Sequence, residues 1–460
     1  MRIPKQLFYV SALFIFGASQ VFAQSAGGQN LTFSPYSNFG IGEWIGTNQV
    51  QCGSNLHTRS GAYSYTMHNP ATLGNLYYTT FDVGGSFKGA KIQAGDQTQT
   101  FQGGGLSYIN LGFRTYNYYH RRAVLDSASK QKRIKSTRYG INSAVSLQPL
   151  TTVGYQYTFR DSTPFINRTT HAGYGGVNMV ELANALRLGQ HISLGYSIGR
   201  VFGQLNDQSI FSVPDSNDLN LLEDIKSVNV HGFQQKVGIM TYFKLDSTYH
   251  TLGASAQFFT GMSGQQTRFT RTMDLIGSQI YVVDTVLNEV SPKTAFSLPG
   301  SFGAGYQFQY RQRWSVALDY RKQVWGTLDP MFFDAGRRYI DRTDYGFTFT
   351  LNPNDFKHPS HKKMRWPVRV GGVLSETQYS FSKPTGAGTN RILQQRAFVG
   401  IGVPLVRRYY DNTVLSSVIH LQLDYVQRGL ASDGLAKEQF INLTMGLQLG
   451  DLWFQRRKFD

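Results

Sequence analysis

The fold is decided by residues 313 to 321, which read Arg-Trp-Ser-Val-Ala-Leu-Asp-Tyr-Arg. Apolar and mainly polar members alternate, with Trp314, Val316, Leu318 and Tyr320 set against Arg313, Ser315, Ala317, Asp319 and Arg321. Successive side chains of an extended chain point to opposite faces, so the stretch predicts a strand with one apolar and one polar face. Burying the charged face in a dry core would be costly. We therefore expect that face to meet water or polar groups.

The same alternation recurs from about residue 80 onward. It is clear at 301–310, 419–425 and 441–449, and further strands are predicted to start near residues 81, 139, 152, 191, 235, 251, 343, 366 and 397. A soluble sandwich also hides apolar faces, so alternation alone leaves open whether they meet lipid or a core. More than a dozen strands of about 9 to 12 residues without a helical layer favour a transmembrane β-barrel. Lipid permits no open sheet edge, so the barrel should close.

The first 23 residues are predicted to be a secretory signal peptide. Arg2 and Lys5 precede an apolar run from Leu7 to Phe16, and Val21-Phe22-Ala23 supplies small residues for cleavage. This signal also fits a soluble secreted β protein. No later apolar run approaches the roughly 18 to 20 residues of a spanning helix. Together with the strand pattern, the signal predicts export to the outer membrane.

The charge balance indicates an anionic partner, with 45 Lys and Arg against 28 Asp and Glu and a formal net charge of +17. An exported protein rarely meets nucleic acid, so outer-membrane lipid and lipopolysaccharide are the expected partners. The stretch from Arg114 to Arg138 is predicted to be an outward loop, as are 206–227, 326–342 and 352–365. Six residues of the stretch from Arg114 to Arg138 could bind lipopolysaccharide phosphates: Arg121, Arg122, Lys130, Lys132, Arg133 and Lys135. A merely solvated loop is the alternative.

Residues 24–79 differ from the rest of the mature chain. Gly, Ser, Asn and Thr are prominent and alternation is weak, which predicts irregular structure outside the strand register. We interpret 24–79 as a hatch that plugs the barrel and 80–460 as the barrel itself. Asn69-Pro70-Ala71 lies just before the first strand, where spacing alone favours a simple turn.

Residues that could carry chemistry have more ordinary interpretations. Gly195-Tyr196-Ser197-Ile198-Gly199 matches the nucleophile elbow of hydrolases, but it lies inside an alternating strand, so we expect Ser197 to be a small residue facing the lumen. His358 and His361 lie among lysines that would repel a metal, so they predict a solvated basic loop. Cys52, the single cysteine, is predicted to be an inert residue of the hatch. We expect no catalytic residue, metal or cofactor.

The chain resembles the outer-membrane long-chain fatty-acid transporter (FadL-like) family. That family carries Asn-Pro-Ala at the position of Asn69, Pro70 and Ala71. The similarity extends to Gly173–Leu205, to Leu298-Pro299 with the strand ending at Val324-Trp325, and to 366–372. The opening at 34–42 and the ending at 453–460 resemble the branch found in Bacteroidetes. The resemblance implies a barrel of about fourteen antiparallel strands filled by an N-terminal hatch.

The resemblance also implies passive uptake of hydrophobic, fatty-acid-like molecules through a shielded pocket toward a lateral opening. Asn69, Pro70 and Ala71 would then form the gate of the hatch, where the fixed φ of proline suits irregular backbone. One departure is that Asp460 follows Phe459, whereas many barrels end on an aromatic residue. Within the branch, related barrels also serve as accessory subunits of secretion or outer-membrane assembly machines, so an outer-membrane protein partner is the alternative.

Overall fold

The computed structural model describes residues 34, 43–44, 49–125, 132–160, 168–214, 219–276, 279–311, 313–326, 338–352, 366–382, 389–408, 414–429 and 436–451. Nearly all of these residues belong to antiparallel strands of one sheet. The described helices are two short 3-10 turns, η2 (Val50–Cys52) and η3 (Pro70–Asn75). Within the described part of the chain, no helix has the length and apolar character needed to cross a membrane.

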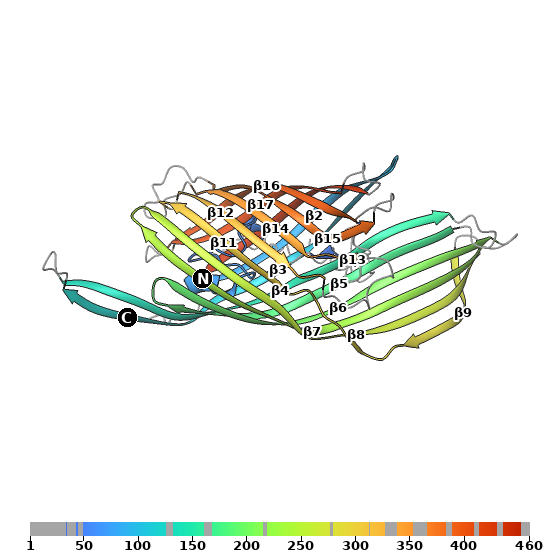
Figure 1. Ribbon diagram of the computed structural model, residues 1–460, viewed down its shortest axis with the longest axis horizontal. Coiled ribbons are helices and arrows are strands. Elements are labelled where there is room, and N and C mark those ends of the chain that lie inside the picture. Colours follow the sequence, from blue (N-terminus) through green and yellow to red (C-terminus); the bar gives the residue numbers. More distant parts are fainter. Residues whose placement is uncertain are drawn as a thin grey trace.

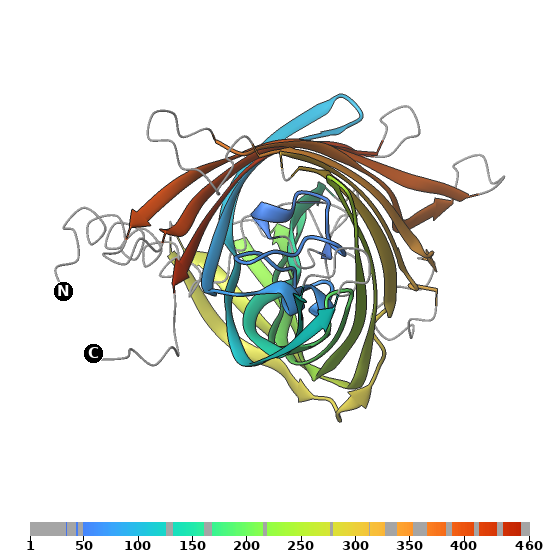
Figure 2. The ribbon, with the colours of Figure 1, turned by 90° about the vertical axis from the view of Figure 1, so that its left-hand side faces the viewer.

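Fourteen described strands form a closed wall (Figures 1 and 2). They are β2 (Thr79–Ala94), β3 (Gln97–Leu125), β4 (Lys132–Arg160), β5 (Arg168–Leu188), β6 (Ile192–Pro214), β7 (Leu219–Leu245), β8 (Thr248–Ile276), β11 (Ser301–Tyr310), β12 (Trp314–Gln323), β14 (Arg342–Leu351), β15 (Val368–Ser382), β16 (Thr389–Arg408), β17 (Val414–Arg428) and β18 (Lys437–Asp451). β18 pairs with β2 and closes the wall. The predicted all-β transmembrane barrel of about fourteen strands is confirmed.

The two faces of the wall differ as the alternation requires. Leu318 on β12 is 52% exposed on the outside, whereas its neighbour Asp319 is buried on the inside. On β6, Tyr196 and Ile198 are exposed and Ser197 is fully buried. An outer face of large apolar side chains around a closed sheet is stable in lipid and not in water. This is an outer-membrane β-barrel, and the predicted lumen-facing position of Ser197 is confirmed.

The strands extend far beyond the bilayer at both rims. β3, β4 and β8 each have 29 residues, whereas about 9 to 11 residues cross the membrane. We call the rim where β2 begins and β18 ends the terminal rim, and the other the opposite rim. The β3–β4 hairpin projects past the terminal rim, and β4 to β8 project past the opposite rim, where β9 (Gln279–Val290) pairs with β8 (Figure 1).

Two predicted outward loops are wrong, because their residues form paired strands. Arg114 to Arg138 contains the outer part of the β3–β4 hairpin, and 206–227 contains the paired ends of β6 and β7. Beyond the bilayer both faces of a sheet can meet water, so polar side chains on both faces do not prevent strand pairing. The predicted loop at 352–365 lies mostly outside the described residues, as does the part of 326–342 between 327 and 337.

Residues 49–78, which we call the luminal segment, lie inside the barrel (Figure 2). The segment contains η2 and η3, and most of its side chains are buried. Before it in the chain, β1 (Glu43–Trp44) pairs with β4 at Thr151 and Thr152. Two further short strands are β10 (Thr294–Ala295), paired with β8, and β13 (Arg338–Tyr339), paired with β15.

Candidate functional site

Asn69 stabilises the turn of Asn69, Pro70 and Ala71, which the sequence analysis predicts to be the gate. Its Oδ1 accepts a hydrogen bond from the Ala71 backbone N–H at 3.1 Å and so caps η3, while Pro70 occupies the first turn, where its missing N–H costs nothing. Its Nδ2 donates to the His57 carbonyl at 2.9 Å and to the Ile239 carbonyl of β7 at 3.3 Å. One fully buried side chain therefore ties the turn both to the luminal segment and to the wall.

Wall glycines let the turn approach the sheet backbone. A Cβ at Gly195 on β6 would lie 2.1 Å from the Ala71 nitrogen, and one at Gly238 on β7 would lie 2.0 Å from Asn69 Oδ1. The Ser193 hydroxyl donates to the Ala71 carbonyl at 2.8 Å. The turn is packed so closely that any other residue type at Gly195 requires a shift of backbone.

A buried ion pair lies beside the turn. Lys236 Nζ on β7 is 2.9 Å from Glu181 Oε2 on β5 and also donates to the Met67 carbonyl of the luminal segment at 2.9 Å. Ser197 Oγ donates to Glu181 Oε1 at 2.5 Å, and Gln148 Nε2 donates to Oε2 at 3.2 Å. Because burying a charge is expensive unless it is paired, this network fixes the segment against β5, β6 and β7.

Polar contacts hold the luminal segment to the other side of the wall as well. His57 Nδ1 lies 2.7 Å from Asp319 Oδ1 on β12, and the same oxygen accepts from the His57 backbone N–H at 2.9 Å. Ser54 hydrogen-bonds Thr348 on β14 at 2.6 Å, and Gln448 on β18 donates to the Tyr63 carbonyl at 2.5 Å. The segment is thus anchored around the barrel rather than along one side.

The chain just before the luminal segment carries a charged anchor. Glu43 lies 2.5 Å from Arg428 on β17 and 3.5 Å from Lys88 on β2. Burial alone would raise the pKa of Glu43, but the two cations outweigh it and lower the pKa to about 2. A lowered carboxyl pKa stabilises the fold above its unfolded value of 4.5, and that stability is lost as the pH falls toward 2.

Cys52 is expected to be inert toward alkylating reagents in the folded barrel. It is fully buried, and burial raises the pKa of its thiol to about 12, so almost none of the reactive thiolate exists at pH 8. Iodoacetamide followed by intact-mass measurement should show no label in detergent and one label after unfolding in urea. A Thr98→Cys variant, which adds a thiol at an exposed position, should gain one label when folded. Labelling of folded Cys52 at the rate of an exposed thiol would contradict the burial.

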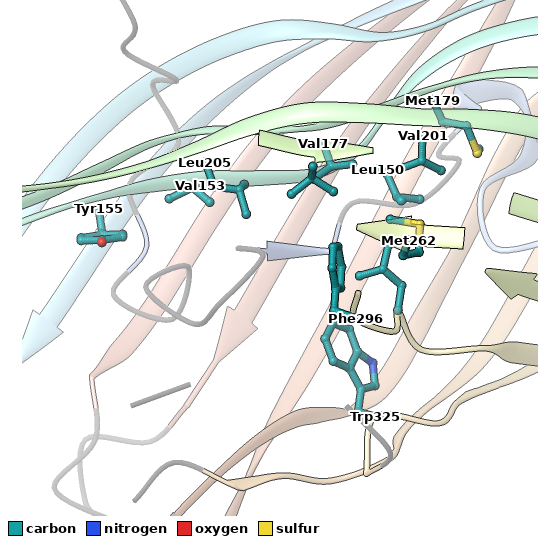
Figure 3. Packing of buried hydrophobic residues seen from close by; sticks show 12 residues of the cluster. Leu150, Val153, Tyr155, Val177, Met179, Val201, Leu205, Met262, Phe296 and Trp325 are labelled. Carbon is teal, nitrogen blue, oxygen red and sulfur yellow. The ribbon is translucent and has the colours of Figure 1, made fainter. Parts of the chain in front are cut away.

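An apolar cluster lies beside this network, toward the opposite rim, and Figure 3 shows its side chains. On β5, Met179 and Val177 share the inward face with Glu181, and on β6 Val201 and Leu205 share it with Ser197. Facing residues come from other strands and from non-strand chain; the buried members are Leu150, Val153, Tyr155, Val177, Met179, Val201, Leu205, Val230, Met262, Phe296, Leu298 and Trp325. The cluster gives this part of the lumen an apolar lining, which is the kind of lining that sites for apolar molecules have.

The predicted lipopolysaccharide-contacting residues are placed at the terminal rim. Arg121, Arg122, Lys132, Arg133 and Lys135 belong to the paired strands of the β3–β4 hairpin, and Lys130 lies outside the described residues. Connections of two or three residues join β5 to β6, β7 to β8 and β11 to β12 at this rim, which is typical of the periplasmic side. The contact with lipopolysaccharide stays a prediction, and this placement counts against it.

Sequence reasoning missed the two charges of the buried pair. Glu181 and Lys236 each lie within a strand, on the face opposite the lipid-facing residues, and this parity is the signal that could have found them. The predicted basic loop with His358 and His361 lies outside the described residues. In the described part of the chain, no group of three or more His, Cys, Asp or Glu residues is arranged to hold a metal ion.

Solved structures with a similar fold include outer-membrane channels. The P. putida toluene transporter TodX is 15% identical with a TM-score of 0.51, covering 86% of this chain and 96% of that chain. The CymD monoaromatic hydrocarbon channel is 11% identical with a TM-score of 0.51, covering 90% and 99%. A Pseudomonas aeruginosa FadL homologue is 10% identical with a TM-score of 0.48, covering 92% and 99%. At these identities the likeness to TodX and CymD shows a shared fold alone.

The comparison of sequences places the chain in a family. A search of curated proteins gives no match. The family model described as BamG matches residues 6–120 and 134–460, which is nearly the whole length. The chain therefore belongs to the BamG family.

Proposed function

We propose that this barrel passes hydrophobic small molecules across the outer membrane, with the luminal segment as its gate. The observation that carries the proposal is the apolar cluster inside the lumen. A barrel that only conducts water and ions is lined by polar groups, whereas this one places valines of three neighbouring strands, Val177, Val201 and Val230, on its inner face. Passive uptake of this kind needs no catalytic residue and no cofactor.

The proposed path begins at the opposite rim. The apolar cluster lies between that rim and the Lys236–Glu181 ion pair, so an apolar molecule entering from the rim reaches the cluster before the luminal segment. TodX and CymD, whose folds are similar, are described as a toluene transporter and a monoaromatic hydrocarbon channel. By analogy of fold, we infer an apolar or fatty-acid-like cargo.

The gate would be the turn at Asn69, Pro70 and Ala71. Its hydrogen bonds to β6 and β7 are few and short in range, so a shift of a few ångströms would break those from Asn69 to Ile239 and from Ser193 to Ala71 together. Such rearrangement is the usual way in which a bound molecule opens a closed segment. In this proposal the closed turn blocks free flow of water and ions.

A lateral exit could use the discontinuity beside β8. Pairing between β8 and β11 ends at Gln257 and Ser301, and the chain from Phe296 to Gly300 that follows β10 has no strand assignment. Phe296 and Leu298 of this stretch are members of the apolar cluster, as is Met262 on β8. Few ladder hydrogen bonds hold the wall together at this point, so we place the exit there.

The test is binding of a fluorescent fatty acid, cis-parinaric acid, to the purified barrel. The intact protein should show saturable binding. A Val177→Thr/Val201→Thr double variant keeps the side-chain volumes but places two hydroxyls in the cluster, and desolvating them should weaken binding by about tenfold.

A matched control separates the cluster from general effects of the substitution. Val180 lies on the same strand as Val177 but faces lipid and is 41% exposed. Val180→Thr should bind the probe as the parent does. Absence of saturable binding to the parent, or equal loss in the control, would remove the support for uptake.

An accessory-subunit role is the second candidate. It is favoured by the anchoring of the luminal segment to strands around the barrel, which makes the closed structure a rigid scaffold. Native mass spectrometry of the protein purified from its own outer membrane tests this role. A stoichiometric protein partner without a retained apolar molecule would favour the accessory subunit, and a lone barrel with a defined apolar ligand would favour uptake.

A further inference from the structure

Arg369 is a buried arginine in the lumen that has no carboxylate partner among the described residues. It is the second residue of β15, and it is 1% exposed, whereas its neighbour Val370 is exposed on the outer face. Its Nη1 donates to His420 Nδ1 on β17 at 3.3 Å. Its Nε and Nη2 are buried without a hydrogen-bond partner. Because a guanidinium stays protonated, Arg369 places an uncompensated positive charge inside the barrel.

The two unpartnered nitrogens form the edge of the guanidinium that binds carboxylates. Nε–H and Nη2–H are parallel, so they can donate together to one anionic group. Other arginines of this barrel use the same edge in this way. Arg268 donates through Nε and Nη2 to the two oxygens of Asp224 at 2.9 and 3.1 Å. Arg321 donates through both nitrogens to one oxygen of Asp344 at 2.9 and 2.6 Å.

Neighbouring residues orient the guanidinium but add no negative charge. A guanidinium only donates hydrogen bonds, so His420 Nδ1 accepts, and the proton of the uncharged ring is on Nε2, which lies 3.4 Å from Gln448 Oε1. A Cβ at Gly400 on β16 would lie 3.3 Å from Arg369 Nη2 and 3.4 Å from Nε. The glycine therefore keeps a side chain away from the unpartnered edge.

Arg59 of the luminal segment brings a second positive charge to the same region. It is the charged group that acts most strongly on Arg369, and the two guanidinium groups repel each other. Arg59 Nε is also buried without a hydrogen-bond partner. The carboxylate that acts on Arg59 is Asp82, whose oxygens already accept from Tyr108 at 3.2 Å and from Gln51 at 2.8 Å. Asp82 offsets at most one of the two cations, so at least one positive charge needs a counter-ion.

We propose that Arg369 and Arg59 bind a small carboxylate ion, which links the luminal segment to β15. The two oxygens of the ion match the Nε–Nη2 edge, and its negative charge compensates the buried cation. A free ion fits better than the head group of a long apolar molecule, because no described member of the apolar cluster lies on β15, β16 or β17. This site is independent of the proposed passage of hydrophobic molecules.

Urea unfolding of the purified barrel in a maltoside detergent at pH 8, followed by tryptophan fluorescence, tests the proposal. Sodium acetate replaces sodium chloride at constant ionic strength, so general screening stays the same. Acetate at ten times its dissociation constant should raise the folding equilibrium constant about tenfold, and the effect should saturate. Arg369→Met should lose this response. In chloride it should be at least as stable as the parent, because it removes an unpaired buried charge.

The matched control is Arg200→Met. Arg200 is exposed on β6 beside Phe233, so the same substitution there should leave the acetate response unchanged. Gly400→Ala is an independent variant that keeps every charge. Its methyl group would crowd the two unpartnered nitrogens of Arg369 and should weaken the acetate response. Heat-modifiable migration shows whether each variant is folded.

Three results would overturn the proposal. The first is equal stability of the parent in acetate and in chloride, which would mean that the edge does not select a carboxylate. The second is an acetate response that persists in folded Arg369→Met, which would place the ion elsewhere. The third comes from sodium decanoate below its micellar concentration. A response to decanoate without one to acetate would assign the edge to the head group of an apolar molecule, which would support the proposed passage while removing the free ion.

Discussion

Replacing Lys236 with methionine is expected to destabilise the barrel by about 3 to 5 kcal/mol, the largest effect of any single substitution proposed for this protein. Lys236 neutralises Glu181, whose carboxylate is fully buried, and it also donates to the Met67 carbonyl. Methionine fills a similar volume but leaves Glu181 without a counter-charge, with Ser197 and Gln148 as its remaining donors. Urea unfolding in detergent, followed by tryptophan fluorescence, measures the loss.

The double variant Lys236→Met/Glu181→Gln is the control. It removes both charges, so most of the lost stability should return, because replacing both members of a buried pair is often close to neutral. If Lys236→Met were as stable as the parent, the ion pair would contribute nothing to holding the luminal segment. If the double variant were as unstable as the single one, the loss would come from packing or from the Met67 contact rather than from the stranded charge.

The barrel itself was predictable from the sequence because lipid on one side of each strand imposes strict alternation. Leu318 and Asp319 illustrate this: their polarity alone assigns one to the outside and the other to the lumen, and the structure agrees. Outside the bilayer that constraint disappears. The ends of β6 and β7 within 206–227 lie beyond Phe202 and Phe233, the last exposed large hydrophobic side chains, so no lipid imposes alternation there. Their sequence therefore predicts a loop, although the two strands pair residue by residue.

The candidate site was only partly predictable. Asn69, Pro70 and Ala71 were found through a resemblance, yet nothing local in the sequence indicates that the turn packs on Gly195 and Gly238, which are more than a hundred residues away. The Gly-Tyr-Ser-Ile-Gly motif at 195–199 lies inside strand β6, as its alternation predicts, and does not have the strand-turn-helix geometry of a hydrolase elbow. Two of its residues have structural roles. Gly195 leaves room for the turn at Asn69, Pro70 and Ala71, and Ser197 donates a hydrogen bond to Glu181. Such roles depend on which strands the luminal segment contacts. The alternation of apolar and polar residues assigns a side chain to the lumen face, but it does not tell which part of the luminal segment lies against it.

The substitution Gly195→Ala is expected to displace the turn and make the closed barrel leak ions. The new Cβ would lie 2.1 Å from the Ala71 nitrogen and 2.4 Å from the Pro70 carbonyl carbon. Both are backbone atoms, so no rotation of a flexible side chain relieves the overlap, and overpacking of this kind costs about 1 to 3 kcal/mol. The wall is held by ladder hydrogen bonds on both sides of β6, whereas the turn is held by a few contacts, so the turn should move first. Conductance in planar bilayers measures the leak.

The matched control is Gly105→Ala on β3, where a new Cβ meets no atom within 4 Å. It makes the same chemical change in the wall and should conduct as little as the parent. Leakage in Gly195→Ala with an intact, heat-modifiable barrel would identify the turn as the element that closes the pore, because the wall would be unchanged. A folded Gly195→Ala barrel that stays closed would instead mean that the contacts on the far side, from His57 to Asp319 and from Ser54 to Thr348, keep the pore shut without the turn. In that case the gate would have to be sought on β12 and β14 rather than at Asn69, Pro70 and Ala71.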